Sequence, residues 1–129
     1  MPGKGTAPSG GRDLQQRVAQ LAEKLGLRAE VEVSAARRLW GARRRIDVVL
    51  THERTGKKLG IECKFQAGSG TAEEKIPATI KDIESWPIPG IVVIEGAGFS
   101  ANMQGYLMST GKVIWFDELE EWLRLYFAL

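Results

Sequence analysis

Apolar residues recur at helical spacing near the start of the chain. From Leu14 to Leu25, leucine and valine stand at every third or fourth position, and Asp13 is placed to cap a helix that contains them. Residues 1–12 before this segment contain several glycines and prolines and few apolar side chains, which is typical of a disordered tail. The pattern therefore predicts a single folded domain over residues 13–129 that opens with a helix.

The pattern then changes to the period of two that is typical of β-strands. Alternating apolar and polar residues predict a half-buried strand near 28–33, a second strand over 46–51 and a third over 59–66. A segment rich in arginine separates the first two strands and is predicted to be a loop. Residues 53–58 contain a glycine and have the length of a hairpin connection, so the second and third strands should be neighbours.

The second half of the chain alternates helices and strands. A helix is predicted over about 71–85, and the continuous apolar run 91–94 is typical of a buried strand. A strand, a crossover helix and another strand imply parallel pairing with a right-handed connection. A short helix at 100–109, a strand at 113–116 and a last helix capped by Asp117 complete the chain. The fold class is therefore α/β, with an αβββαβ core, a mixed central sheet flanked by helices and a C-terminal α-β-α extension.

Composition excludes several classes of site. The 129 residues include one cysteine, Cys63, and one histidine, His52, so a monomer cannot build a zinc site from Cys and His ligands or use a pair of catalytic histidines. No apolar run approaches the roughly 20 residues that a membrane span requires, and the first residues lack the apolar stretch of a signal peptide. We expect a cytoplasmic protein.

Charge is unevenly distributed along the chain, although the net charge is only +2. Residues 28–64 contain ten Lys or Arg against five Asp or Glu, an excess of +5. Residues 113–129 contain one Arg against four acids, an excess of −3. A polyanion would be attracted to the first segment and repelled by the second, which favours nucleic acid as a partner.

The third predicted strand separates a core face from a row of reactive groups. Side chains alternate between the two faces of a strand, so Glu62, Lys64 and Gln66 share the face opposite Cys63. The hairpin brings Asp47 alongside, so two carboxylates and an amine can converge at the edge of the sheet. Two carboxylates suit Mg²⁺, and a lysine beside the cation can orient or deprotonate an attacking water. This combination predicts hydrolysis of phosphodiester bonds.

The order Asp47, hairpin, Glu62-Cys63-Lys64 resembles the signature of the PD-(D/E)XK nuclease superfamily, which is restriction-endonuclease-like in fold. The resemblance covers residues 13–95 and agrees with the predicted order of helices and strands. It implies that Asp47, Glu62 and the backbone carbonyl of Cys63 hold Mg²⁺, for which Mn²⁺ can substitute. It further implies that Lys64 acts on the water, that DNA is cut with 5′-phosphate ends, and that the catalytic residues are Asp47, Glu62, Lys64 and Gln66.

The chain departs from this family pattern in its first helix. Many members carry a Glu there as an additional metal ligand, and the nearest equivalents are Gln15 and Gln16. A carboxamide is a weaker ligand than a carboxylate, so the number of metals per site stays open.

Basic residues near the predicted site are candidates for phosphate binding. The arginines of the predicted loop lie just before Asp47, and they form either a solvated loop or a phosphate-binding segment, since the guanidinium fork fits phosphate oxygens. Residues 70–77 look similar to a segment of some restriction-like enzymes, which makes Lys75 a further phosphate contact. The predicted nucleic-acid-binding residues are Arg37, Arg38, Arg43, Arg44, Arg45 and Lys75.

Other interpretations remain open from the sequence. Gly96 and Gly98, followed by a helix, superficially match a dinucleotide-binding turn, but a tight strand-to-helix turn explains them adequately, since no second βαβ unit follows. A non-catalytic nucleic-acid-binding module on the same fold would keep the arginines and would not need the carboxylates. Because one such site cuts one strand, cleavage of a duplex would require a second subunit, and we expect a homodimer.

Overall fold

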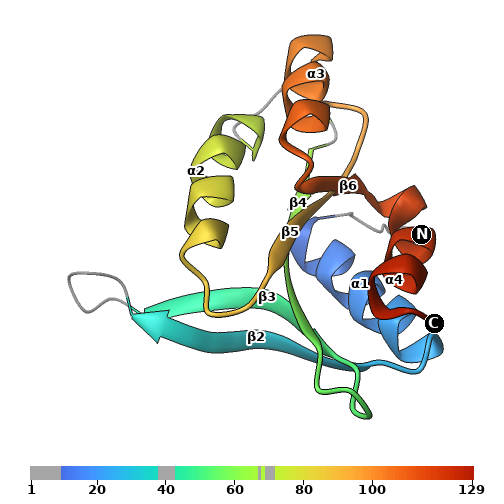
Figure 1. The fold of residues 1–129 in the computed structure, drawn as a ribbon. Coiled ribbons are helices and arrows are strands. Elements are labelled where there is room, and N and C mark those ends of the chain that lie inside the picture. Colours follow the sequence, from blue (N-terminus) through green and yellow to red (C-terminus); the bar gives the residue numbers. More distant parts are fainter. Residues whose placement is uncertain (1–9, 38–42, 67, 69–71) are drawn as a thin grey trace.

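The computed structural model describes residues 10–37, 43–66, 68 and 72–129, and its helices and strands follow the predicted order (Figure 1). In chain order the elements are α1 (Gly11–Lys24), β2 (Arg28–Arg37), β3 (Arg43–Thr51), β4 (Lys58–Phe65), α2 (Ala72–Glu84), β5 (Gly90–Glu95), α3 (Ala101–Thr110), β6 (Val113–Trp115), the 3-10 turn η1 (Phe116–Glu118) and α4 (Leu119–Phe127). Within these residues, every helix is too short or too polar to cross a bilayer. The predicted α/β class, αβββαβ core and α-β-α extension are confirmed.

The five strands form one mixed sheet in the order β2-β3-β4-β5-β6. β2 and β4 both run antiparallel to β3, while β5 runs parallel to β4 and to β6. The parallel pairing of β4 with β5 across α2 confirms the predicted crossover. β4 lies at the centre of the sheet, where it is paired on both sides.

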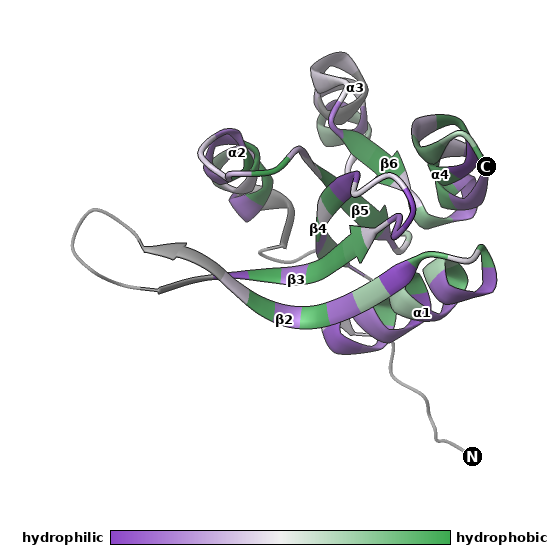
Figure 2. Ribbon diagram, turned by 60° about the horizontal axis from the view of Figure 1, so that its bottom comes forward, coloured by the Kyte–Doolittle hydropathy of each residue, from purple (hydrophilic) through white to green (hydrophobic). Residues whose placement is uncertain are grey.

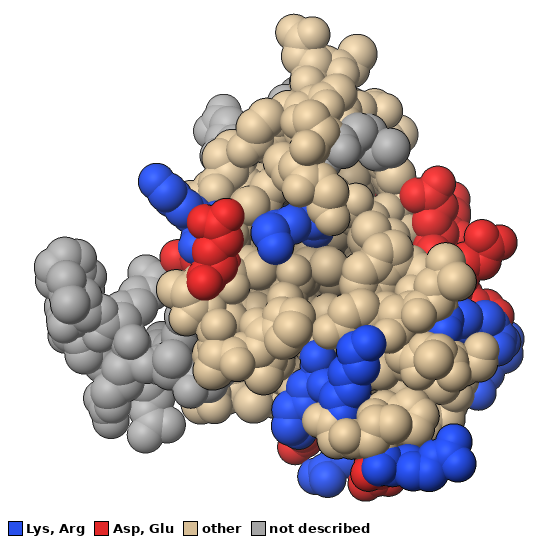
Figure 3. Space-filling view, in the orientation of Figure 1, with Lys and Arg blue, Asp and Glu red and all other residues tan. Residues whose placement is uncertain are grey.

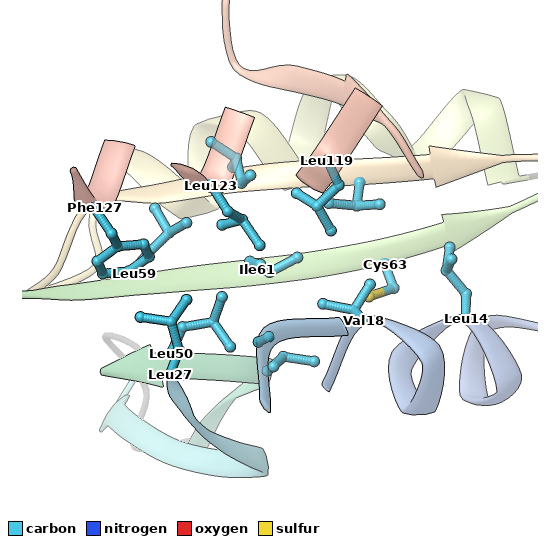
Figure 4. Packing of buried hydrophobic residues seen from close by; sticks show 14 residues of the cluster. Leu14, Val18, Leu27, Leu50, Leu59, Ile61, Cys63, Leu119, Leu123 and Phe127 are labelled. Atoms are coloured by element: carbon cyan, nitrogen blue, oxygen red, sulfur yellow. The ribbon is translucent and has the colours of Figure 1, made fainter. Parts of the chain in front are cut away.

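Two layers of helices cover the sheet, with α1 and α4 on one face and α2 and α3 on the other (Figures 1 and 2). The first face buries a cluster contributed by α1, α4 and the strands, in which Ile61 and Cys63 of β4 point toward the helices (Figure 4). The second face buries a cluster built around α2 and Trp86. Cys63 is 5% exposed, in agreement with its prediction as a core residue.

Two predicted helix caps are wrong. α1 begins at Gly11 with Gly10 as its N-cap, so Asp13 lies inside the first turn, where its carboxylate pairs with Arg17 at 2.9 Å. Asp117 lies within η1, one residue before the N-cap of α4. In α1 the acidic side chain stabilises the first turn from within it, and in α4 a 3-10 turn that contains Asp117 precedes the helix.

The arginine-rich segment forms strands where a loop was predicted. Arg37 pairs with Arg43, so the basic run occupies the end of β2 and the start of β3. Within the described part of the chain, β3 pairs with β4 only over Val48–Thr51. Residues 33–37 and 43–46 therefore form a two-stranded extension, the distal ribbon, which projects beyond the other strands (Figure 1).

Candidate active site

β3 and β4 separate at the position of Asp47. The ladder between the two strands ends at the pair Val48 and Ile61. Beyond that pair, Oδ2 of Asp47 accepts a hydrogen bond of 2.9 Å from the backbone N–H of Cys63. The Asp47 carboxylate is thus the hydrogen-bond partner of the Cys63 N–H, because the β3–β4 pairing has already ended at this position. This bond fixes Asp47 at the point where the strands part.

A sharp local twist within β3 brings Asp47 to this position. Val48 belongs to the cluster beneath α1, whereas Ile46 packs in the cluster beneath α2. Residues two apart on a regular strand share one face, so β3 must twist sharply between them. The residue at the matching position of β2 is Glu32, whose φ is 56°. β2 and β3 are therefore both irregular at the point where the distal ribbon begins.

β4 supplies the other two predicted groups. Glu62 and Lys64 are half-buried and alternate with Ile61 and Cys63, which point into the α1 cluster. Glu62 and Lys64 lie close enough to Asp47 to affect its pKa, which both of them lower. The structure thus brings Asp47, Glu62 and Lys64 together.

The electrostatics of the site follow from burial and crowding of carboxylates. Burial raises the pKa of Asp47 above its ordinary value, the Cys63 N–H and Lys64 act against this rise, and Glu32 adds to it. Burial also raises the pKa of the Cys63 thiol, and the nearby carboxylates of Asp47 and Glu62 increase that effect. The thiol therefore remains neutral and apolar in the core, and only the backbone of Cys63 faces the site.

The donor set fits a hard divalent cation. Asp47 and Glu62 offer carboxylate oxygens, and an added Cβ on Gly11 would lie 3.9 Å from the Cys63 carbonyl oxygen, so this carbonyl faces the start of α1. Among the described residues, no three His, Cys, Asp or Glu side chains are grouped to hold a metal by themselves. Mg²⁺ tolerates such a set, because it retains several waters and typically binds one or two carboxylates.

Gln66 lies beyond the end of β4 and is buried against the segment that follows β5. Its side-chain amide donates to the carbonyl of Gly98 at 2.9 Å, and the N–H of Gly98 donates to the Gln66 carbonyl at 2.8 Å. A Cβ on Gly96, whose φ is 117°, would lie 2.1 Å from that same carbonyl oxygen. The glycines therefore permit close packing of two backbones in the connection between β5 and α3. A catalytic role for Gln66 stays a prediction.

The predicted phosphate-binding residues that the structure describes lie on three elements, β2, β3 and α2. Arg45 is exposed on β3 and pairs with Glu32 at 3.3 Å, and Lys75 is exposed on α2. Arg37, Arg43 and Arg44 are placed by their backbone in the distal ribbon, and Arg38 lies outside the described residues. In the view of Figure 3, basic side chains also gather around the loop between β3 and β4, and acidic ones gather where β6 leads into α4.

Sequence reasoning missed Glu32, and it gave Gln15 a different role, that of a weak metal ligand. Gln15 is 6% exposed, and its Nε2 donates to Oε2 of Glu32 at 3.0 Å. Gln15 stands three residues before Val18 and seven before Ala22, both buried, so a polar residue on the apolar face of α1 was a signal available in the sequence. Glu32 fitted the strand alternation and gave no such signal.

Comparisons with known proteins agree with this geometry. A family model described as a PD-(D/E)XK nuclease superfamily domain matches residues 6–113. The match covers most of the chain, which therefore belongs to the PD-(D/E)XK nuclease superfamily. No curated protein matches the sequence significantly.

Two solved structures share the fold. A protein of unknown function, AF1548, is 21% identical with a TM-score of 0.55, over 79% of this chain and 55% of its own. Protein VC1899 from Vibrio cholerae is 16% identical with a TM-score of 0.57, over 86% of this chain and 31% of its own. This chain thus spans about half of the first protein and about a third of the second, and at these identities the likeness concerns the fold alone.

Proposed function

We propose that the protein is a Mg²⁺-dependent endodeoxyribonuclease that hydrolyses DNA phosphodiester bonds and leaves 5′-phosphate ends. One observation carries the proposal: Asp47 is fixed where β3 and β4 separate, beside Glu62 and within reach of the charge of Lys64. Membership of a nuclease superfamily supports it. A non-catalytic binding module would have no need of two adjacent carboxylates.

Each group then has a distinct task. Asp47, Glu62 and the Cys63 carbonyl hold the cation, which when bound would neutralise phosphate charge and favour ionisation of a water. Lys64 Nζ holds the attacking water against the phosphate. The water loses one proton to solvent as its oxygen bonds to phosphorus, the bond from phosphorus to the 3′ oxygen breaks, and the 3′ oxygen takes a proton from solvent.

DNA binding is assigned to the basic residues on either side of the site. Arg45 and Lys75 are exposed and can reach phosphates, and Arg37, Arg38, Arg43 and Arg44 belong to the same proposal. These contacts would position the duplex without reading its sequence. A homodimer would bring two such sites to the two strands, and we propose a cytoplasmic setting.

The test compares wild type with Lys64→Ala and Asp47→Asn on supercoiled plasmid and on branched DNA, with Mg²⁺, Mn²⁺ or EDTA. Wild type should nick in either cation, and Lys64→Ala should be slower by about 10²- to 10⁴-fold, the range for loss of a proton-handling group. Lys58→Ala is the matched control, because Lys58 starts the same strand and bonds Thr51 at 3.0 Å. Nicking that persists in EDTA or in the Lys64 variant would refute the assignment.

A further inference from the structure

A third carboxylate lies beside the candidate site, at a position that the mechanism above does not use. Glu32 occupies the level of Asp47 on the neighbouring strand, between the pairs that flank both residues. Its negative charge acts on Asp47. Both of its oxygens are held, because Gln15 donates to Oε2 at 3.0 Å and Arg45 donates to Oε1 at 3.3 Å.

The backbone and the partner of Glu32 are both unusual for a surface residue. A φ of 56° is disfavoured for any side chain with a Cβ, and glycine or asparagine would adopt it more easily than glutamate. Gln15 is almost fully buried, so its amide is committed to this carboxylate. Residues kept in such conformations are frequent at functional sites, where the side chain is needed in one place.

We propose that Glu32 is a positioning residue of the cation site, and that Gln15 holds its charge beside Asp47 and Glu62 to strengthen their binding of a divalent cation. The inference rests on the proposed function of that site. Among the described residues no three acidic side chains converge as direct ligands, so Glu32 acts through its charge and not through coordination. Partners of this kind change metal affinity by about 10- to 100-fold when they are mutated.

Arg45 provides a second test of the proposal, because its removal should change cation affinity in the opposite direction to the removal of Glu32. Its guanidinium lies 3.3 Å from Glu32 and offsets part of the negative charge beside Asp47. If charge is what Glu32 contributes, removal of Arg45 should strengthen cation binding while removal of Glu32 weakens it. A purely structural role for this ion pair would make both variants change in the same direction.

The experiment measures Mn²⁺ affinity by isothermal titration calorimetry on the whole protein without DNA. Glu32→Gln keeps an oxygen that can accept from Gln15, so it should fold and bind Mn²⁺ about tenfold more weakly than wild type. Glu30→Gln is the matched control, because Glu30 lies on the same strand and pairs with Arg28 at 3.6 Å. It should bind as wild type does. Arg45→Gln should bind more tightly, and Gln15→Met should bind more weakly than wild type but less so than Glu32→Gln.

The outcomes separate this inference from the proposed function. If wild type binds Mn²⁺, Asp47→Asn does not, and Glu32→Gln equals Glu30→Gln, the cation site stands and the role of Glu32 is overturned. Equal weakening by Glu32→Gln and Arg45→Gln, accompanied by lower melting temperatures, would also overturn it. Failure of wild type to bind Mn²⁺ would overturn both the site and the inference.

Discussion

β4 and the distal ribbon are both β-structure, yet they are stabilised in different ways. β4 is paired on both sides, and its side chains alternate regularly between a buried cluster and the site. In the distal ribbon, β2 and β3 pair only with each other among the described residues. The pairing changes register between Ser34 and Ala36, and Glu32, just before the ribbon, has a positive φ. The contrast indicates that packing fixes Glu62 and Lys64, whereas Asp47 owes its position to the point where the regular sheet ends.

The largest expected effect compares β4 with β2, the strand that continues into the distal ribbon, by truncating Ile61 in β4 and Val31 in β2. Ile61 in β4 is fully buried, so Ile61→Ala should lower the free energy of unfolding by about 2–5 kcal/mol. Val31 in β2 is 41% exposed, so Val31→Ala should change it by no more than about 0.5 kcal/mol. Urea unfolding monitored by tryptophan fluorescence measures both. Equal destabilisation would show that the two strands do not differ in this way.

A second prediction concerns the junction between β4 and the ribbon. A Cβ on Gly60 would lie 2.6 Å from the ring of Trp86 and 3.3 Å from Cγ2 of Ile46, the residue before Asp47. Trp86 is buried and cannot move aside freely, so Gly60→Ala should cost about 1–3 kcal/mol of stability. Because it also displaces Ile46, it should slow plasmid nicking in Mg²⁺.

The control for this junction is Gly56→Ala in the β3–β4 loop, where no described atom lies within 4 Å of the added Cβ. Its positive φ of 78° makes that variant less stable through the backbone alone. It should leave the nicking rate of the folded protein unchanged. A Gly60→Ala protein that nicks as fast as wild type would show that Ile46 does not help to place Asp47.

The regular region could be predicted from the sequence, and the irregular one could not. Alternation in β4 indicated which side chains face the site, because burial on one face leaves a period of two in the sequence. In contrast, Arg43, Arg44 and Arg45 have no apolar alternation, and they become a strand through pairing with β2. Strand formation depends on such tertiary context more than on local preference.

The same limit applies to the candidate site. Asp47, Glu62 and Lys64 were predicted because their spacing resembles a family signature. The structure places Glu62 and Lys64 close enough to Asp47 to affect its pKa, and their catalytic roles stay a prediction. Glu32 could not be found, since a positive φ leaves a signal only when the residue is glycine or asparagine. Its partner Gln15 was considered as a weak ligand, whereas the structure shows it bonded to Glu32.

A third prediction sharpens the contrast by changing the ribbon without changing the core. Replacing Arg43, Arg44 and Arg45 with glutamine should weaken binding of duplex DNA and leave urea unfolding almost unchanged. For each phosphate that the variant no longer neutralises, the slope of log K against log salt should become shallower by about 0.9. Fluorescence anisotropy in EDTA, over a series of salt concentrations, measures this slope.

Arg124→Gln is the control for the ribbon arginines, because Arg124 lies on acidic α4 and pairs with Glu120 at 3.1 Å. Its salt slope should equal that of wild type. If the triple variant also retains the wild-type slope, the distal ribbon does not bind DNA, and the basic side chains around the β3–β4 loop become the alternative surface.

The smallest expected effect concerns the stability cost of Asp47 itself. Because burial raises its pKa above the ordinary value of 3.8, the folded state favours the protonated form. That contribution to stability is complete below the unfolded pKa and is lost as pH rises through the raised, folded pKa. At neutral pH without a cation, the folded protein therefore carries an unfavourable ionised Asp47. An asparagine at this position would have no charge and could still accept the N–H of Cys63 through its side-chain oxygen.

Asp47→Asn should therefore be more stable than wild type at pH 7.5 in EDTA, although it fails to nick DNA, and its advantage should shrink toward pH 4. Chemical denaturation at both pH values measures the difference, with Asp82→Asn on α2 as the comparison for loss of a carboxylate elsewhere. Addition of Mg²⁺ at pH 7.5 should stabilise wild type and not the variant, because the cation then offsets the charge that burial disfavours. If Asp47→Asn is instead less stable than wild type at neutral pH, the hydrogen bond that the Asp47 carboxylate accepts from β4 stabilises the fold by more than the burial of its charge destabilises it. The main role of Asp47 would then be structural.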